Sequence, residues 1–485
     1  ESIRKKLLPL VRVAQTLAQK YDVVVTNPPY MGASNMNPKL NEFIKQNYTD
    51  YKSDFFSAFI VKCSNMAKPE GYCGFFTPYV WMFIQSYEKL RQYLYQQATL
   101  ETLIQFEYSA FEEATVPVCT FTFSNRYVNK KGCYLRLVDF RGGMEVQRQK
   151  TLEAMTNHDC GFYYEQSTDN FAKIPGSPVA YWVSNNFLKA FDNEKIGKYT
   201  ISDGQTKTGN NDKYLRLLWE VPVSEIGKGK HWVLHAKGGA FRRWYGNIDT
   251  LIDWSDSARE HYRTDHVARI APEYIWFRKG ICWTLISSNK LHGFRLLDDN
   301  STFNLAAPSV FFNNDRMMFY ILGYLNTKFS QEIIALLNPT LNTNISDITA
   351  QPLYYGKSPE QEDMVINLVS QNIALSKADW DSFETSWDFT RHPFIKAITK
   401  YPNRMDIGNI YLAECYDIWA GECEERFEKL KANEEELNRI FIDIYGLQDE
   451  LTPEVEDKDV TVRKADLGRD VRSFISYAVG CMFGR

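Results

Sequence analysis

A short apolar run that ends in a rigid polar turn, YDVVVTNPPY at residues 21–30, constrains the fold of this chain more than any other stretch. The β-branched run from Tyr21 to Thr26 predicts a strand buried on both faces, as in a parallel sheet. Pro28 and Pro29 fix φ and lack an N–H group, so the strand must end before them. The segments that follow alternate between helical and strand-like patterns. This alternation predicts an α/β domain with a largely parallel sheet.

The texture of the sequence changes twice along the 485 residues, which are too many for one ordinary core. Up to residue 145, expected helices (2–20, 53–68, 86–97) alternate with expected strands (21–26, 101–106, 116–125). From 146 to 356, short β-rich pieces alternate with Gly, Asn and Asp turns, which predicts an irregular α+β domain. The rest reads as helical, including a long polar helix over 412–445 that ends at Gly446 and whose charges we expect to face solvent.

The net charge of −4 excludes a chain that binds nucleic acid through its overall charge. Residues 228–295 nevertheless hold twelve lysines and arginines against six acids, a net of +6, while 414–459 hold five against sixteen, a net of −11. A nucleic-acid contact is therefore expected in the basic middle. The nine cysteines show no zinc-type spacing, which predicts reduced thiols, a cytoplasmic protein and no metal site. We find no membrane span or signal-peptide pattern.

The turn itself carries the chemistry. Open parallel sheets bind ligands at the carboxyl ends of their strands, where Asn27 to Tyr30 would lie. The Asn27 side-chain oxygen and the Pro28 carbonyl offer two acceptors on a stiff loop, which suits a planar amino group. Holding both of its N–H bonds makes the amino nitrogen nucleophilic, and Tyr30 offers a flat face for a base. The alternative is a purely structural turn that closes a strand.

These residues carry a resemblance to a known family. DVVVTNPPY resembles the catalytic motif of S-adenosylmethionine-dependent amino-group methyltransferases. DFFSAFIVKCSNMAKPEGYCGFFTP and AFEEATVPVCTFTF resemble later segments of the gamma-type adenine-N6 DNA methyltransferases. GQTKTGNNDKYLRLLWEV, KGGAFRRWYGN, LNPTLNTNISDI, DWDSFETSWDF and SFISYAVGCMFGR are similar to the BREX-type PglX proteins of phage defence and their restriction–modification relatives.

The resemblance implies both a fold and an activity. Residues 1–145 would be the C-terminal part of a Rossmann-like methyltransferase sheet, 146–356 an α+β target recognition domain, and 357–485 a helical C-terminal region. Asn27, Pro28, Pro29 and Tyr30 would be catalytic, and Phe111 would stack with Tyr30 on a flipped adenine. The S-adenosylmethionine motif of such enzymes precedes the turn, and none occurs before Asn27, so we expect it upstream of this chain.

Double-stranded DNA is the expected partner, and further phage-defence subunits are possible ones. Two loops, TGNND and KGGAFRRWYGN, combine polar, basic and aromatic residues in the way that phosphate contact and base readout require. The expected DNA-binding residues are Thr208, Asn210, Asn211, Lys237, Arg242 and Arg243. An ordinary Asn-rich turn and surface arginines on a strand are the alternatives.

Two other functions remain open at this stage. The same Asn-Pro-Pro-Tyr turn serves enzymes that methylate glutamine side chains of proteins, but those enzymes are short and lack a large basic, aromatic domain. The chain could also be a non-catalytic DNA-binding or target-recognition fragment, because the cofactor half is not present in it. We find no acidic constellation that predicts nuclease activity.

Overall fold

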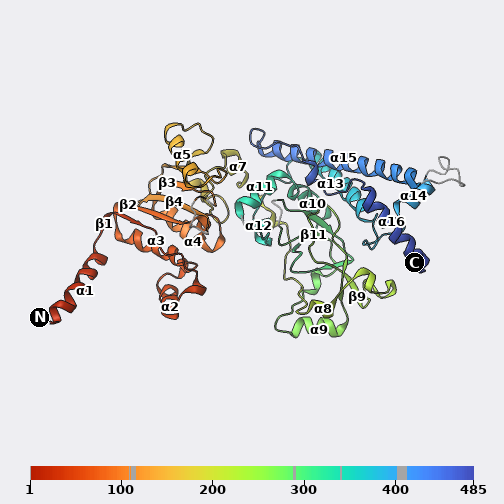
Figure 1. Ribbon diagram of the computed structural model, residues 1–485, viewed down its shortest axis with the longest axis horizontal. Coiled ribbons are helices and arrows are strands. Elements are labelled where there is room, and N and C mark those ends of the chain that lie inside the picture. The colour runs from red at the N-terminus through yellow and green to blue at the C-terminus, as the bar shows by residue number, and fades with distance from the viewer. Residues whose placement is uncertain are drawn as a thin grey trace. The chain divides into compact units, whose positions relative to one another are not determined.

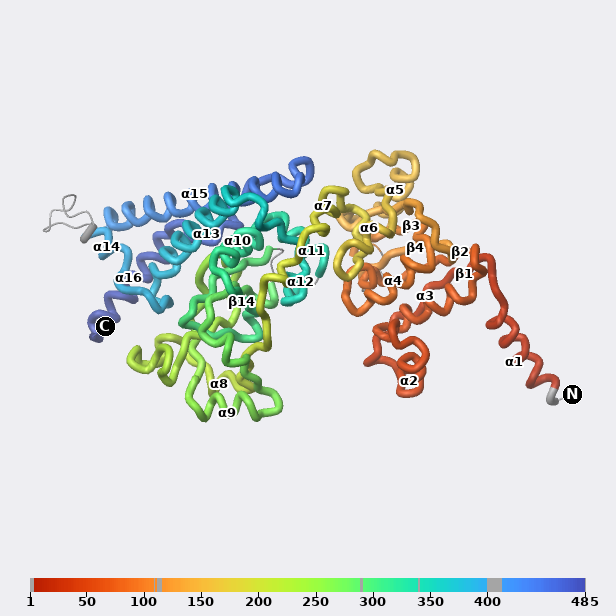
Figure 2. Tube along the Cα trace, turned by 180° about the vertical axis from the view of Figure 1, so that it is seen from behind, coloured from red at the N-terminus to blue at the C-terminus, as the bar shows by residue number. Residues whose placement is uncertain are grey.

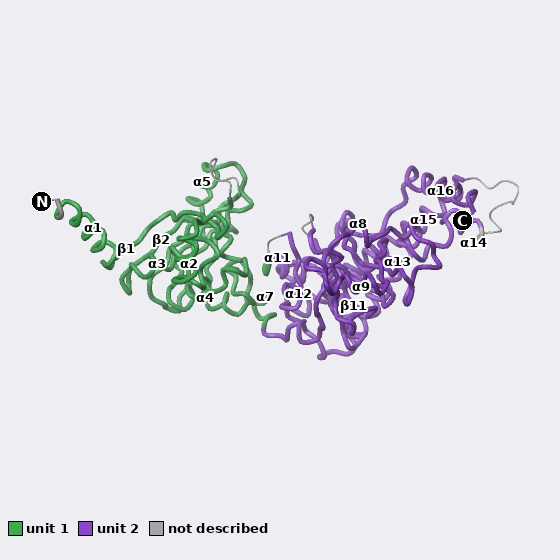
Figure 3. Tube along the Cα trace, turned by 90° about the horizontal axis from the view of Figure 1, so that it is seen from below, with its two compact units in different colours: residues 1–191, 336–339 green, residues 192–335, 340–485 purple. Residues whose placement is uncertain are grey.

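The computed structural model describes residues 2–108, 110, 116–287, 291–338, 341–400 and 412–484. It divides into two compact units, shown in different colours in Figure 3. Unit 1 comprises residues 1–191 with 336–339, and unit 2 comprises 192–335 with 340–485. The predicted boundary at 145/146 falls inside a helix of unit 1, α5 (Gly143–Thr156), because the chain after that helix returns to the same sheet.

Unit 1 is built around one six-stranded sheet. Its strands are β1 (Tyr21–Thr26), β2 (Ala67–Pro78), β3 (Thr99–Gln105), β4 (Val118–Ser124), β5 (Lys131–Arg136) and β6 (Tyr163–Ser167). Its helices, besides α5, are α1 (Ser2–Ala18), α2 (Pro38–Asn47), α3 (Phe55–Met66), α4 (Glu88–Gln97), α6 (Thr168–Phe171) and α7 (Asn185–Ala190). The strand at 21–26 is confirmed at its predicted bounds, and the helices expected at 53–68 and 86–97 are confirmed within two residues.

The sheet is mixed rather than largely parallel. Its order is β1-β2-β4-β3-β5-β6. The pairs β1–β2 and β3–β5 are parallel, whereas β4 pairs antiparallel with both β2 and β3, and β6 pairs antiparallel with β5. Strands β1, β2, β3 and β5 therefore run in one direction, with β4 inserted between β2 and β3 in the opposite direction. The carboxyl ends of those four strands meet at one edge of the sheet.

Helices α3 and α4 cover one face of this sheet, and α5 lies on the other side, as Figures 1 and 2 both show. The buried cluster beneath α3 and α4 is aromatic: Phe56 and Leu90 from the helices pack with Phe75, Phe121 and Phe123 from the strands. A smaller cluster joins Ala154 of α5 to Leu135 at the end of β5. The larger buried core thus lies on the face of the sheet covered by α3 and α4, the helices that follow the Asn-Pro-Pro-Tyr turn.

The expectation that β1 is buried on both faces is wrong for the part of the chain that the structure describes. Val23 and Val25 are 58% and 73% exposed, and Tyr72 on the neighbouring strand is also exposed. The physical reason is position: β1 is an edge strand with a single neighbour, and α3 packs only on its other face. One apolar face of β1 is therefore open, and the other, with Val24, is only half-buried.

Unit 2 contains three small sheets and a helical part. One sheet has the order β13-β9-β10-β8, a second β12-β11-β14, and the third pairs β15 with β7. The strands are β7 (Glu194–Lys195), β8 (Leu215–Leu217), β9 (Trp232–Ala236), β10 (Thr250–Asp253), β11 (Gly280–Trp283), β12 (Phe294–Leu297), β13 (Ser301–Phe303), β14 (Ser309–Phe311) and β15 (Pro352–Leu353). The helices are α8 (Asn211–Tyr214), α9 (Asp256–Thr264), α10 (Asp315–Leu325), α11 (Lys328–Leu337), α12 (Ile345–Thr349), α13 (Pro359–Trp380), α14 (Pro393–Lys400), α15 (Leu412–Tyr445) and α16 (Leu467–Met482).

The range predicted to be helical, 357–485, contains α13 to α16. Helix α10 contacts both the β11–β12 strands and the pair α13 and α15, so it joins the β-rich part to the helices. Helix α15 has its predicted bounds, and Gly446 after it takes a left-handed φ of 66°, as a C-cap glycine does. Its charged residues are mostly exposed, but Glu434 is buried, contrary to a fully solvated charge run.

Candidate active site and nucleic-acid interface

The Asn-Pro-Pro-Tyr turn lies at the edge of the unit 1 sheet where four parallel strands end. Asn27 follows β1 directly and is exposed, while Pro28 is buried and anchors the turn. No hydrogen bond from the described residues reaches the Asn27 side-chain amide or the Pro28 carbonyl. Both oxygens therefore remain free to accept hydrogen bonds from a ligand at the edge where open sheets bind ligands.

Tyr30 is held in place by a neighbouring strand. Its hydroxyl donates to the carbonyl oxygen of Phe76 on β2 at 3.0 Å, and its ring meets Phe56 edge-on, with centroids 6.3 Å apart. Burial, with a smaller contribution from Cys119, raises the pKa of Tyr30 to about 12, so the hydroxyl stays a donor at neutral pH. The side chain is still 38% exposed. The ring is thus fixed in orientation but available for contact.

The chain after the turn is fastened by Asp54, a residue that the sequence did not single out. Asp54 caps the N-terminus of α3, and its Oδ1 accepts from the backbone N–H groups of Phe56 at 3.2 Å and Met31 at 2.9 Å. The Phe55 N–H donates to the Met31 carbonyl at 3.0 Å. An Asp directly before an apolar helix is a recognisable capping signal, although its second bond to Met31 is not visible in sequence.

The predicted stacking residue Phe111 lies outside the described residues, so its role stays a prediction. The nearest described residues after β3 are aromatic as well. Phe106 packs against Phe76 with ring centroids 6.2 Å apart, and Tyr108 is 60% exposed. Because β3 runs parallel to β1, these rings follow the same carboxyl edge of the sheet as Tyr30.

In unit 2, Arg242 and Arg243 occupy positions that argue against contact with DNA. Both are buried: Arg242 forms an ion pair with Asp379 of α13, and Arg243 pairs with Glu434 of α15 at 2.9 Å. Trp244 also donates to Glu434, at 2.6 Å. Their ion pairs are formed within the chain, because the KGGAFRRWYGN loop packs against the helices. These arginines join the β-rich part to the helical part.

The pKa directions in these pairs follow from burial. Burial lowers the pKa of the Arg242 guanidinium, and Asp379 opposes that shift. Burial raises the pKa of the Glu434 carboxyl, and Arg243 opposes it. Each pair thus stabilises charged groups that would be costly to bury alone.

The TGNND loop has one buried and two exposed members among the predicted residues. Thr208 is buried, and its hydroxyl donates to Asn211 at 2.7 Å. Asn210 is exposed and caps the short helix α8 through Lys213 N–H at 3.1 Å. Thr208 and the Asn210 side chain therefore shape the loop, whereas Asn211 lies on the surface.

The structure brings Asn211 and Lys237 together at one open groove of about 380 Å³. Its lining residues are Asn211, Asp212, Leu215, Arg216, Leu217, Glu220, Lys237 and Thr250. Arg216 was not predicted as a DNA-binding residue. In KYLRLLW it stands between two leucines, as a polar residue does in an ordinary half-buried strand. Lys237 is exposed and forms no ion pair within the described part of the chain. The groove thus places the ammonium group of Lys237, the guanidinium of Arg216 and the amide of Asn211 on one surface.

The described ranges contain no group of three or more His, Cys, Asp or Glu placed to hold a metal ion. Within those ranges, no helix combines the length and the apolar character needed to cross a membrane. All nine cysteines are free thiols.

The chain is similar in sequence to known DNA methyltransferases. The family described as Eco57I restriction-modification methylase matches residues 5–111. The adenine-specific methyltransferase PglX of Lacticaseibacillus casei (strain Zhang) is 36% identical across 99% of this chain, which covers 41% of that protein. The adenine-specific methyltransferase BrxX of Escherichia coli O9:H4 (strain HS) is 30% identical across 99% of this chain and 40% of its own length. The chain thus spans about two fifths of these relatives.

Among solved structures, the Type IIL restriction–modification enzyme MmeI, determined in complex with DNA, has a TM-score of 0.52 to this chain. The match covers 94% of this chain and 57% of that one, at 10% sequence identity. At this identity the likeness concerns the fold alone. It extends over both the sheet of unit 1 and the β-rich and helical parts of unit 2.

Proposed function

Since this chain is a homologue of the adenine-specific methyltransferases PglX and BrxX along 99% of its length, we propose that it supplies the catalytic turn and the target-recognition part of an adenine-N6 DNA methyltransferase. The single observation that carries the proposal is the turn after β1. There, the free oxygens of Asn27 and Pro28 stand beside the fixed ring of Tyr30. The larger protein would act in phage defence or restriction–modification.

The chain's own residues would act by positioning. An adenine leaves the duplex at a cost of about a few kcal/mol in stacking and pairing. Asn27 Oδ1 and the Pro28 carbonyl accept the two N6 hydrogens, which draws the nitrogen lone pair out of conjugation with the ring. Tyr30 supplies one flat wall, and we propose Phe111 as the other. Asp54 binds the chain after the turn to the N-terminus of α3, because its Oδ1 accepts from both Met31 and Phe56.

S-adenosylmethionine would supply the methyl group that the activated nitrogen attacks. The described residues before Asn27 hold no glycine-rich turn between a strand and a helix, the usual cradle of such a nucleotide-like ligand. We therefore propose that its main binding motif lies in a preceding segment of the whole protein. The open apolar face of β1, with Val23 and Val25 exposed, offers a surface for such a segment.

For DNA, we propose that the open groove of Asn211, Arg216 and Lys237 contacts the duplex, within the predicted recognition range 146–356. An exposed lysine and a half-buried arginine suit phosphate oxygens, and an asparagine suits a base edge. Arg242 and Arg243 have no part in this proposal, because both are paired inside the chain. A short glutamine methyltransferase would need none of unit 2.

The test is direct in cells. Genomic DNA from cells that carry the whole gene should contain N6-methyladenine at a defined sequence, detected by single-molecule sequencing. The same gene with Asn27→Ala should give none, while Asn35→Ala, an exposed asparagine in the same region, should retain the modification. Methylation that survives Asn27→Ala refutes the assignment. Absence of N6-methyladenine with the wild-type gene as well favours the non-catalytic recognition function.

A further inference from the structure

A buried arginine without a carboxylate partner lines a small cavity in unit 2. Arg295, on β12, is 1% exposed. It forms no ion pair with any described aspartate or glutamate, and its Nε has no hydrogen-bond partner among them. Its Nη1 donates to the Arg242 carbonyl at 3.3 Å. A guanidinium carries five N–H donors, so most of its capacity is not used there.

The neighbouring arginines show what is missing. Arg242 and Arg243 are almost as buried, and each has a carboxylate partner. The ionisable group beside Arg295 is instead the thiol of Cys282, its cross-strand neighbour on β11. Burial raises the pKa of the Cys282 thiol, so the thiol is neutral at neutral pH and does not balance the guanidinium. A buried charge is normally paired, so Arg295 lacks a counter-ion.

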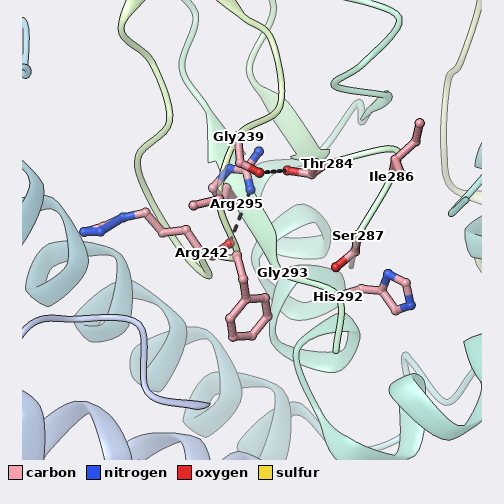
Figure 4. Close-up of a pocket in the computed structure, with 10 residues that line it drawn as sticks. Gly239, Arg242, Thr284, Ile286, Ser287, His292, Gly293 and Arg295 are labelled. Carbon is pink, nitrogen blue, oxygen red and sulfur yellow. Dashed lines mark hydrogen bonds between the residues drawn. The ribbon is translucent and has the colours of Figure 1, made fainter. Parts of the chain in front are cut away.

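The cavity beside it is formed by residues 239–242 of the KGGAFRR loop and by residues that follow β11 and precede β12, such as Thr284 and Gly293. Its volume is about 90 Å³, several times the ~10–15 Å³ that one water needs. Thr284 donates to the Gly239 carbonyl at 3.2 Å, and Figure 4 shows both residues next to Arg295. In the same view the Arg242 side chain extends away from the other lining residues. The guanidinium at this cavity is therefore that of Arg295.

Glycine is required to build this wall. A Cβ on Gly293 would lie 2.2 Å from the Arg242 carbonyl oxygen, which is closer than side chains allow. Gly239 has a left-handed φ of 121°, a conformation that other residues rarely adopt. The two loops can thus approach closely and still leave a space next to Arg295.

We propose that this cavity binds a phosphate-sized oxyanion through Arg295, either as a free anion or as a phosphate group of nucleic acid. An oxyanion supplies the missing negative charge and can accept several parallel N–H bonds from one guanidinium. The residues of this site belong to unit 2, whereas the Asn-Pro-Pro-Tyr turn belongs to unit 1, and the binding needs no methyl transfer. It can therefore stand or fall separately from the proposed function.

The first experiment compares thermal unfolding of the chain in potassium phosphate and in potassium chloride at equal ionic strength and pH. Saturating phosphate should raise the Tm of wild type by about 2 °C or more. Arg295→Gln should abolish the difference. Because loss of a buried arginine can impair folding, a second variant is placed at the rim: Ile286→Glu, where the native side chain lines the cavity and is 61% exposed. Its negative charge should weaken phosphate binding about 3- to 10-fold.

The matched control is Val223→Glu, which adds the same charge at a residue that is 72% exposed and does not line the cavity. A second arm measures the affinity of wild type, Ile286→Glu and Val223→Glu for duplex DNA. If the ligand is a DNA phosphate, Ile286→Glu weakens duplex binding more than Val223→Glu does. If it is a free anion, only the phosphate effect on Tm responds. Equal Tm values in phosphate and chloride for wild type, with equal duplex affinities for both glutamate variants, overturn the proposal.

Discussion

The Tyr30 hydroxyl donates a hydrogen bond of 3.0 Å to the Phe76 carbonyl oxygen, and this bond ties the turn after β1 to the adjacent parallel strand β2. The turn itself has no other anchor of this kind: Pro28 is buried, but Asn27 projects without a partner among the described residues. Because β2 is the neighbour of β1, this bond fixes the turn that carries the acceptor oxygens of Asn27 and Pro28. A tyrosine that is only a flat surface for a base would not need this bond.

Removal of the Tyr30 hydroxyl should therefore affect rate more than stability. Tyr30→Phe keeps the ring and loses one hydrogen bond, with a stability cost of about 1 kcal/mol. Methyl transfer by the whole protein should fall between about 10- and 100-fold, because the acceptors and the base lose their alignment. Single-turnover rates measure this. The control is Tyr72→Phe, on the exposed face of β2, and equal rates for the two variants would contradict a positioning role.

The buried ion pair of Arg242 and Asp379 should be required for the stability of unit 2. Asp379 also pairs with Arg463, with Nη2 to Oδ2 at 3.1 Å, and with Arg426, with Nη1 to Oδ1 at 4.0 Å, so Asp379→Ala leaves three guanidinium groups without this partner. Loss of one member of a buried pair costs about 3–5 kcal/mol. Urea unfolding should show that decrease in the free energy of unfolding. Asp417→Ala, at an exposed position on α15, is the control and should have little effect.

Sequence reasoning was most accurate where local chemistry decides the structure. The β-branched run and the two prolines set both ends of β1, and the polar helix before Gly446 has its predicted bounds in α15. It failed where distant parts of the chain meet. Arg242 and Arg243 are adjacent, basic and flanked by aromatics, yet their partners Asp379 and Glu434 are more than a hundred residues away.

The edge of the unit 1 sheet that carries Asn27 to Tyr30 shows the same division. Asn27 to Tyr30 could be singled out from one stretch, because proline geometry and the strand's end are local properties. The role of Asp54 depends on the pairing of two segments 23 residues apart. Similarly, Arg216 became a candidate only when β8 and the loop containing Lys237 were seen to line one groove. The mixed direction of the sheet could not be derived either, since strand β4 is inserted between two strands that precede it in sequence.

Charge removal in the open groove should change DNA binding in a salt-dependent way. Lys237→Ala and Arg216→Ala should each weaken binding, and each should reduce the slope of log affinity against log salt concentration by about 1 if it removes a phosphate contact. Fluorescence anisotropy with a labelled duplex across a salt series gives both values. Lys429→Ala on the exposed side of α15 should change neither. Unchanged slopes for both groove variants would exclude the groove as the phosphate-binding surface.

Acid should destabilise unit 2 through His235. The ring is fully buried, contacts Thr302 through Nδ1 at 2.8 Å and Asn304 through Nε2 at 3.2 Å, and burial lowers its pKa to about 3. The unfolded histidine binds a proton below a pKa of about 6.5, so stability falls as pH drops from 6.5 towards 3, by about 1.4 kcal/mol per pH unit. Unfolding measured at pH 7, 6 and 5 should show a smaller slope for His235→Gln than for wild type. Replacement of the exposed His266 by Gln is the control, and equal slopes for wild type and His235→Gln would rule out this linkage.

The most direct test of the central claim is the single-turnover rate of methyl transfer from S-adenosylmethionine to adenine N6, measured for the whole protein with Asn27→Ala. Loss of a positioned acceptor should reduce the rate by at least about 100- to 1,000-fold, while the dissociation constant for duplex DNA stays within about twofold, because unit 2 is untouched. Asn35→Ala should behave as wild type in both respects. A rate within about tenfold of wild type for Asn27→Ala, at unchanged DNA affinity, would contradict the account.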